Sequence, residues 1–218
     1  MDKWFLVYDD PYAKVNYAKA KEKIVTLKKL VTGKGIHGSH RMCADQSLTD
    51  RFVVLDADCE LLDSFSYTKL LTSLTNEKKV FVFRSINPVN NLVYGHGGVK
   101  VFDRRLFDDN NAVDMTTAFD ITTVDYITNI HKFNSTAFHT WRTAFRECVK
   151  LSSGVIKLRN TQDDEYRLTT WCEEFNDVEY ADYAKLGALA GREYGHSSKD
   201  LNNINDFKWL RSKFEEIK

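Results

Sequence analysis

The stretch "RFVVLDADCELLDSF", residues 51–65, leads four consecutive apolar residues directly into two aspartates. The run Phe52–Leu55 is typical of a buried strand, so the sequence predicts a strand over residues 51–55. Side chains two positions apart on an extended segment point to the same side, so Asp56 and Asp58 should face one spot just beyond the carboxyl end of that strand. In open α/β sheets, ligands bind at this edge.

Two carboxylates this close repel each other unless a cation lies between them, and a hard divalent ion shared with a phosphate group would do so. An isolated D-x-D is more often a solvated strand end or a helix cap. Here a buried strand precedes it, and the glycine-punctuated stretch "VTGKGIHGSH" (31–40) lies upstream. Such a loop offers backbone N–H groups to phosphate oxygens, which favours a site for a metal ion and a phosphate.

The elements around this strand indicate an α/β fold. We expect a strand at 4–8, an amphipathic helix over 12–30, a glycine loop over 31–40 and a short helix over 41–48. Downstream we expect a strand at 78–88, two short strands joined by a glycine turn within 90–107, and loops with a short helix over 112–139. The remaining helices are expected at 140–151 with Thr140 as N-cap, 163–175, 179–195 and 204–217.

Composition excludes several classes of protein. With 218 residues, 43% of them hydrophobic, the chain can bury one full core, and no repeat or linker divides it. Equal numbers of basic and acidic residues, 31 each, give no overall attraction to a polyanion. The four cysteines form no C-x-x-C pair, which favours buried reduced thiols over a zinc or disulfide framework. No apolar run approaches the ~20 residues of a membrane helix, so we expect a soluble cytoplasmic protein.

Longer motifs resemble the GT-A glycosyltransferases. The segment 35–65 resembles their donor-binding half, and "YGHGGVKVFDRRLF" (94–107) is similar to the G-G-x-x-x-F segment of their acceptor side. "AFRECVKL" and "DDEYRLTTW" resemble their F-x-E helix and E-D-x-x-x-R-L helix start. The resemblance implies a Rossmann-like mixed sheet flanked by helices in a single domain, with a nucleotide-sugar-binding half (1–65), an acceptor half (78–195) and a C-terminal segment (196–218).

A closer resemblance is to the TET-associated glycosyltransferases of bacteriophages and the related base J glucosyltransferases. It rests on "FLVYDDPYA", "KGIHGSHRMCAD", "VVLDADCELLDSF", "INPVNNLVYGHGGVKVF" and "LGALAGREYG", among other segments between residue 5 and about residue 195. It implies transfer of glucose or arabinose from a UDP-sugar to the hydroxyl of 5-hydroxymethylcytosine or hydroxymethyluracil in phage DNA. The reaction would take place in the cytoplasm of an infected bacterium, without a membrane partner. Two alternatives remain: a polysaccharide or small-molecule acceptor, and a nucleotide-sugar-binding or nucleotidyl-transfer protein.

The GT-A pattern also implies roles for the acidic pair. Asp58 would contact Mn²⁺ or Mg²⁺ directly, and Asp56 would contact the metal, the ribose or the sugar. His196 would be a third metal ligand, since imidazole suits Mn²⁺. A solvated surface histidine explains His196 equally well.

Other candidate donor contacts each have a structural alternative. Asp9 and Asp10 would accept hydrogen bonds from ribose hydroxyls, or they stabilise their own Asp-Asp-Pro turn. Gly97 and Gly98 would bring backbone close to the sugar, or they form a hairpin turn. In the glycine loop, the candidates for phosphate or sugar contact are Gly35, His37 and His40, although lone histidines are usually packed or solvated.

An acceptor hydroxyl must lose its proton as it attacks the anomeric carbon, so an inverting enzyme needs a nearby base. The cluster Asp163, Asp164 and Glu165 at a helix start is the best candidate, with Asp164 preferred. Helix N-termini favour acidic residues for electrostatic reasons alone, which is the alternative. The sequence reads D-D-E-Y-R-L rather than E-D-x-x-x-R-L, so the acting residue is open.

Trp141 is expected in the core rather than beside the acceptor. A DNA acceptor predicts a basic surface beside the site. Outside the helix at 19–29 the basic residues are scattered along the chain: Lys100, Arg104, Arg105, Lys150, Lys157 and Arg159.

Overall fold

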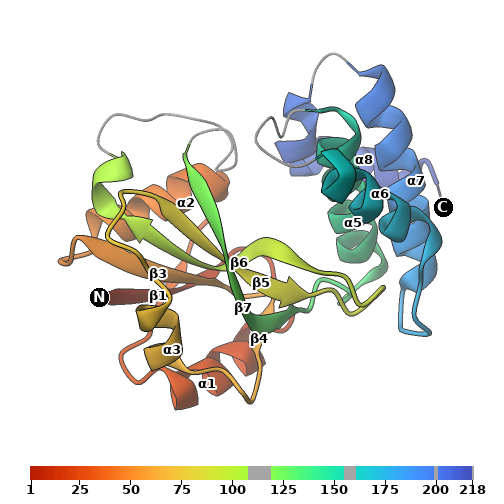
Figure 1. Cartoon of the computed structure of the whole chain (residues 1–218). Coiled ribbons are helices and arrows are strands. Elements are labelled where there is room, and N and C mark those ends of the chain that lie inside the picture. The colour runs from red at the N-terminus through yellow and green to blue at the C-terminus, as the bar shows by residue number, and fades with distance from the viewer. Residues whose placement is uncertain (108–118, 155–160, 199–200, 218) are drawn as a thin grey trace. The chain divides into compact units, whose positions relative to one another are not determined.

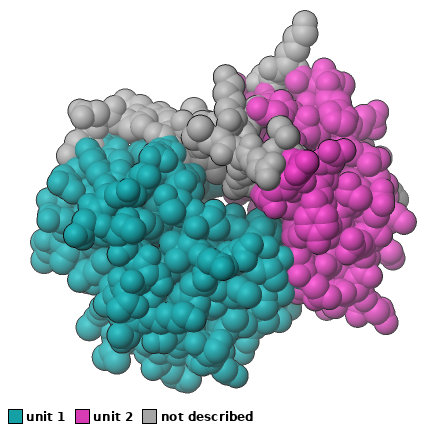
Figure 2. Space-filling view, viewed as in Figure 1, with its two compact units in different colours: residues 1–87, 93–132 teal, residues 88–92, 133–218 magenta. Residues whose placement is uncertain are grey.

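The computed structural model describes residues 1–107, 119–154, 161–198 and 201–217 (Figure 1). The chain forms two compact units, one of residues 1–87 and 93–132 and the other of residues 88–92 and 133–218 (Figure 2). The first unit is a mixed sheet flanked by helices, so the predicted α/β class is confirmed. The assignment of a donor half and an acceptor half within one domain stays a prediction.

The first unit is built on a seven-stranded sheet in the order β2-β1-β3-β6-β5-β7-β4. The strands are β1 (Asp2–Val7), β2 (Lys28–Val31), β3 (Arg51–Asp56), β4 (Cys59–Leu61), β5 (Val80–Ile86), β6 (Val93–Asp103) and β7 (Ile121–His131). β1 pairs in parallel with β2 and β3, whereas β6 runs antiparallel to β3 and β5. β3 therefore has a strand on each side, and its carboxyl end lies at the same edge as that of β1.

Helices cover both faces of this sheet. Helices α1 (Ala13–Lys23) and α3 (Tyr67–Thr72) lie on one face, and α2 (Gly35–Asp45) with the 3₁₀ turn η1 (Arg104–Phe107) lies on the other (Figure 1). Val53 and Leu55 pack on the α1 side, whereas Phe52 and Val54 pack on the α2 side. A strand buried on both faces reads as a continuous apolar run, which explains residues 52–55.

The second unit is helical, with α5 (Ala137–Ser152), α6 (Thr161–Glu173), α7 (Ala181–Ser197), the 3₁₀ turn η2 (Asn202–Asn205) and α8 (Phe207–Glu215). Trp141 of α5 is 1% exposed, which places it in the core as expected. Three glycines of α7, spaced four apart, lie against backbone carbonyls of α5: Gly187, Gly191 and Gly195. A Cβ on Gly191 would lie 2.3 Å from the carbonyl oxygen of Phe145, so only glycine permits this close packing.

Two predictions about the N-terminal segment are wrong. The expected helix over 12–30 ends at Lys23, and residues 28–31 form the edge strand β2. The β-branched pair Val25-Thr26 disfavours continuation of the helix, and pairing with β1 rewards an extended chain. The expected glycine loop is also shorter, because α2 begins at Gly35 and contains Gly38.

Three further predictions about local structure are wrong. The glycines at 97 and 98 do not turn a hairpin, since β6 runs continuously from Val93 to Asp103. Within the region 112–139, expected as loops with a short helix, residues 121–131 form β7 and α5 begins at Ala137, whereas residues 112–118 lie outside the described ranges. The N-cap of α5 is Thr136, whose hydroxyl accepts from the His139 backbone N–H at 3.1 Å, rather than Thr140.

All four cysteines are buried and free. No helix in the part of the chain that the structure describes combines the length and apolar character needed to cross a membrane.

Candidate functional site

Asp56 and Asp58 lie at the carboxyl edge of the sheet. Asp56 is the last residue of β3, opposite Leu6 of β1, and the backbone N–H of Ala57 still donates to the Leu6 carbonyl at 2.9 Å. Ala57 is buried between the two aspartates. The side chains of Asp56 and Asp58 keep 21% and 29% of their surface exposed, so the pair opens to solvent at the edge where ligands bind in α/β sheets.

Asp56 is paired with a lysine from the neighbouring strand. Lys100 of β6 donates from Nζ to Asp56 Oδ2 at 2.7 Å. The second oxygen, Oδ1, is buried and has no hydrogen-bond partner in the described ranges. Burial raises the pKa of Asp56 to about 6, and the charge of Lys100 opposes this rise. Asp56 therefore keeps one carboxylate oxygen available for a ligand.

Asp58 is held by the end of β7. His131 Nε2 lies 2.9 Å from Asp58 Oδ2, and the backbone N–H of Lys132 donates to the Asp58 carbonyl oxygen at 2.6 Å. The His96 ring lies against the His131 ring, with centroids 3.6 Å apart. Burial works to raise the pKa of Asp58, but His131, with a smaller effect of His96, brings it below its ordinary value. Asp58 is thus ionised, and among the residues that the structure describes its Oδ1 accepts only a long hydrogen bond of 3.5 Å, from the Cys59 thiol.

Two glycines of β6, Gly97 and Gly98, lie beside Lys100 and Cys59, which neighbour the acidic pair. Gly97 has φ +86°, a conformation that favours glycine, and a Cβ there would lie 3.6 Å from Cδ of Lys100. A Cβ on Gly98 would lie 2.1 Å from the Cys59 sulfur. Gly98 therefore leaves room for Cys59, the neighbour of Asp58, and the contact of either glycine with a sugar stays a prediction.

The candidate residues of the glycine stretch lie on α2. His40 is 1% exposed, and its Nδ1 lies 2.7 Å from the Ile36 carbonyl oxygen, so Nδ1 carries a proton. Burial and the charge of Lys100 lower the pKa of His40 well below its ordinary value, so the ring is neutral. His37 is partly exposed, and burial lowers its pKa too. Gly35, at φ +70°, is the first residue of α2. Their contacts with phosphate stay predictions.

The acidic pair after β1 contributes to a turn. Asp10 accepts from the Tyr8 backbone N–H at 3.3 Å through Oδ2, and its carbonyl oxygen accepts from the Ala13 N–H at 3.1 Å. Asp9 is exposed beside it. Asp10 therefore has the structural role that the turn alternative assigned to it, and ribose binding by either residue stays a prediction.

In the second unit, two members of the predicted base cluster, Asp163 and Asp164, lie beside a buried arginine. The Arg167 side chain is 4% exposed and contacts the carboxylate of Glu147 on α5. Its Nη1 also lies 3.6 Å from Asp164 Oδ1 and 3.9 Å from Asp163 Oδ2. Arg167 thereby links the F-x-E segment to the start of α6. Of the three candidate bases, Asp164 is the most shielded, at 16% side-chain exposure against 58% for Asp163, whereas Glu165 is exposed.

His196 is exposed in the last turn of α7 and belongs to the second unit, so its part in a metal site stays a prediction. Two residues that contact the aspartates, His131 and Lys100, were not identified as site residues from sequence. The signal available for Lys100 was a lysine between apolar residues of the strand "VKVF", directly after the two glycines.

The acidic pair fits a divalent ion whose remaining coordination positions are filled by a bound substrate and water. Within the described ranges, no three His, Cys, Asp or Glu side chains converge on one ion position. Mg²⁺ commonly binds through one or two carboxylates together with substrate phosphates and water. The unpartnered Oδ1 of Asp56 and the weakly bonded Oδ1 of Asp58 provide two such oxygens.

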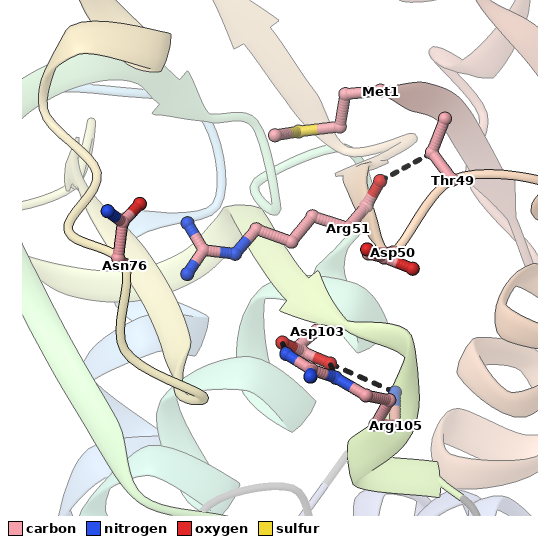
Figure 3. Close-up of a pocket in the computed structure, with 7 residues that line it drawn as sticks. All are labelled: Met1, Thr49, Asp50, Arg51, Asn76, Asp103 and Arg105. Atoms are coloured by element: carbon pink, nitrogen blue, oxygen red, sulfur yellow. Dashed lines mark hydrogen bonds and ion pairs between the residues drawn. The ribbon is translucent and has the colours of Figure 1, made fainter.

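A second pocket lies at the opposite, amino end of β3, and its two arginines are already paired with protein groups (Figure 3). Arg51 donates from its guanidinium to the carbonyl oxygens of Thr75 and Glu77, each at 2.7 Å. Arg105 forms an ion pair with Asp103 at 2.6 Å. Both cations of the pocket are therefore paired with protein groups, and the Asp56–Asp58 edge is the candidate site.

No family model and no curated protein matches this chain. Among solved structures, it is similar to the mannosyltransferase PcManGT from Pyrobaculum calidifontis in complex with GDP-Man and Mn²⁺, at 11% identity and TM-score 0.47, over 97% of this chain and 82% of that one. It is also similar to TarS residues 1–349 from S. aureus, at 9% identity and TM-score 0.39, over 100% and 83%. HddC from Yersinia pseudotuberculosis matches at 11% identity and TM-score 0.39, over 57% and 68%. These similarities assign neither a family nor an activity to the chain.

Proposed function

We propose that the protein is a metal-dependent glycosyltransferase that moves a sugar from a nucleotide-sugar, a UDP-linked glucose or arabinose, to a hydroxyl group of hydroxymethylated pyrimidines in phage DNA. The observation that carries the proposal is the buried, unpartnered Oδ1 of Asp56 beside Asp58 at the carboxyl edge of β3. An ionised carboxylate oxygen without a hydrogen-bond donor is costly unless a cation or ligand reaches it.

The nucleotide-sugar would bind at the carboxyl edge of β3. Asp56 and Asp58 would hold Mn²⁺ or Mg²⁺, with His196 as a proposed third ligand. When bound, the ion supplies positive charge that stabilises the departing diphosphate. His131 keeps Asp58 oriented, as partners of metal-binding groups commonly do. Asp9 and Asp10 are the proposed contacts for the ribose.

Phosphate and sugar contacts are proposed from two further segments. Gly35, His37 and His40 belong to the first turns of α2, where backbone N–H groups and the helix dipole favour an anion. Gly97 and Gly98 of β6 are the proposed contacts for the sugar.

The transfer requires one proton acceptor. The acceptor hydroxyl oxygen forms a bond to the anomeric carbon, the bond from that carbon to the diphosphate oxygen breaks, and the hydroxyl proton passes to a carboxylate. Asp164 is the proposed base in an inverting reaction, with Asp163 and Glu165 as its alternatives. The geometry favours Asp164, because its side chain is the more shielded, at 16% exposure against 58% for Asp163, and lies 3.6 Å from the buried Arg167 guanidinium, which can hold its orientation.

The support for DNA as acceptor is the sequence resemblance to the phage enzymes. A C5 hydroxymethyl group projects into the major groove of duplex DNA, so its hydroxyl can be reached without base flipping. Among the basic residues considered for DNA contact, Arg104 donates to the Ser47 carbonyl oxygen at 3.0 Å and Arg105 pairs with Asp103. Lys157 and Arg159 lie outside the described ranges.

The decisive test combines donor and acceptor. The protein is incubated with Mn²⁺, a panel of UDP-sugars and DNA carrying 5-hydroxymethylcytosine or 5-hydroxymethyluracil, and the DNA is then digested to nucleosides and weighed. We expect a mass gain of one hexose or pentose with one of the sugars. Asp58→Ala should abolish it, whereas Asp63→Ala, at a fully exposed aspartate outside the site, should not.

The alternatives give different results in the same assay. Transfer to a polysaccharide or small molecule but not to DNA would overturn the acceptor and keep the enzyme class. Donor binding or pyrophosphate exchange without glycoside formation would overturn glycosyl transfer itself.

A further inference from the structure

Lys100 is a buried lysine whose hydrogen-bonding capacity is only partly used. The residue is 8% exposed, and its Nζ donates to Asp56 Oδ2 at 2.7 Å. A lysine ammonium has three donors. Within the described ranges this is the only hydrogen bond of the ammonium, so two donors are left for another acceptor.

The remaining hydrogen-bond donors of Lys100 lie beside a carboxylate oxygen that accepts no hydrogen bond in the described ranges. Asp56 Oδ1, on the other side of the same carboxylate, is buried and has no donor among the residues that the structure describes. One water molecule could serve either group. A ligand that brings anionic oxygens for Lys100 and a cation for Asp56 would serve both, and a metal-bound diphosphate is such a ligand.

The structure provides a specific place for this lysine. The side-chain stem of Lys100 lies beside Gly97, where a Cβ would be 3.6 Å from Cδ and 3.9 Å from Cγ. Lys100 is the cross-strand partner of Val54, whose side chain packs on the α2 side of the sheet, so the Lys100 side chain leaves β6 on that face and reaches Asp56 at the acidic edge. Lysine is rarely buried unless it is paired, and the partner of Lys100 is a carboxylate of the acidic pair itself.

We propose that Lys100 is both the counter-cation of Asp56 before the donor binds and a ligand of the donor's diphosphate. Before binding, it offsets the repulsion between the two aspartates. On binding, its remaining donors would reach phosphate oxygens, and Asp56 would hold the metal ion, which would supply positive charge there. This inference rests on the proposed function, since it assigns a residue to the diphosphate of the same site.

The proposal predicts effects of opposite sign on two ligands. In Lys100→Met, the positive charge that competes with the metal ion is gone, so Mn²⁺ alone should bind more tightly than to the wild type. UDP in the presence of Mn²⁺ should bind roughly tenfold or more weakly, because a charge-assisted hydrogen bond to phosphate is lost. UMP should lose less affinity than UDP. Both affinities are measured by calorimetry at pH 8, with Mn²⁺ binding checked by electron paramagnetic resonance.

Two further variants separate this role from a purely structural one. Lys100→Arg keeps the charge and should restore most of the UDP affinity. Lys79→Met removes a lysine that pairs with Glu77 and Asp120 at the start of β5, and it should change neither affinity. Thermal melts of each variant show whether the fold survives.

The outcomes distinguish this inference from the proposed function. If Lys100→Met leaves UDP affinity unchanged, or weakens Mn²⁺ and UDP binding by the same factor while lowering the melting temperature, the role of Lys100 is wrong. In that case normal UDP–Mn²⁺ binding by the wild type, lost in Asp58→Ala, would leave the proposed function standing. If the wild type binds neither Mn²⁺ nor UDP, both proposals fail.

Discussion

His131 Nε2 lies 2.9 Å from Asp58 Oδ2, which joins the last residue of β7 to a residue 73 positions earlier in the chain. The histidine is buried, so the contact fixes the orientation of the carboxylate. We expect His131→Ala to lower Mn²⁺ affinity by about 10- to 100-fold, which is typical when the partner of a metal ligand is removed. Mn²⁺ titration followed by electron paramagnetic resonance measures it.

His196→Ala is the matched comparison for this titration. If His196 is a direct ligand, as proposed, its loss should weaken Mn²⁺ binding at least as much as His131→Ala. Unchanged affinity in His196→Ala would remove it from the site, and unchanged affinity in His131→Ala would show that the Asp58 contact is only structural.

The packing of Gly98 against Cys59 predicts a specific rescue. Gly98→Ala places a methyl group 2.1 Å from the Cys59 sulfur, so we expect a loss of about 1–3 kcal/mol in the free energy of unfolding. Cys59→Ala removes that sulfur and should recover a large part of the loss in the double variant. Urea unfolding of the wild type, both single variants and the double variant gives the coupling energy. Additive effects would show that the two residues do not compete for this space.

The glycines of α7 predict a similar sensitivity in the second unit. Gly191→Ala would bring Cβ to 2.3 Å from the Phe145 carbonyl oxygen, which forces α5 and α7 apart. We expect a destabilisation of about 1–3 kcal/mol, since overpacking against backbone cannot be relieved by a rotamer change. Gly33→Ala, where a Cβ would meet no atom within 4 Å, is the control. Equal melting temperatures for the wild type and Gly191→Ala would contradict the close approach of the helices.

The cluster Asp163, Asp164 and Glu165 predicts that loss of the base lowers kcat without changing the affinity for UDP. Asp164→Asn should lower kcat by about 10²- to 10⁴-fold, the usual contribution of a general base, with little change in UDP affinity. Asp163→Asn and Glu165→Gln, at the more exposed neighbours, should have smaller effects. The measurement is steady-state transfer to hydroxymethylated DNA combined with calorimetry of UDP. A larger loss of kcat in Asp163→Asn or Glu165→Gln would reassign the base.

Asp2 predicts a pH dependence of stability. Its carboxylate accepts from Lys28 Nζ at 2.7 Å and from the Leu48 backbone N–H at 2.8 Å. The hydrogen bond from Lys28, against the opposing effect of burial, holds the pKa of Asp2 well below its ordinary value. A lowered folded-state pKa stabilises the protein at pH values above the unfolded pKa of about 3.9, and this stabilisation is lost as the pH falls below it.

Asp2→Asn should therefore be less stable than the wild type at pH 7, and the difference should shrink between about pH 4 and pH 2. Urea midpoints at several pH values measure this. A difference that stays constant over that range would contradict the assignment.

The sequence was most informative where burial leaves a local pattern. The apolar run 52–55 predicted β3 because both faces of that strand are covered, and the strand end placed Asp56 and Asp58 at the sheet edge. Trp141 was predicted in the core from the apolar face of its helix, and it is 1% exposed.

The contacts of the acidic pair could not be predicted in the same way. His131 reaches Asp58 because β7 lies between β5 and β4, and that strand order has no local signature in a threonine-rich segment. Lys100 reaches Asp56 across the β3–β6 pairing, although lysine in a strand normally indicates a solvent face. Both contacts are products of strand pairing between segments more than 40 positions apart.

The second unit contains the short segment 88–92 as well as residues 133–218, so the polypeptide passes between the units after residues 87, 92 and 132. During synthesis, β7 is therefore the last strand of the sheet to leave the ribosome, and His131 is the last residue of that strand. Until then Asp58 lacks its contact with His131, and a polypeptide ending near residue 110 would have an incomplete sheet and an Asp58 without that partner. Neither unit can be expressed alone by truncating the chain at one position, because residues 88–92 of the second unit lie between two segments of the first.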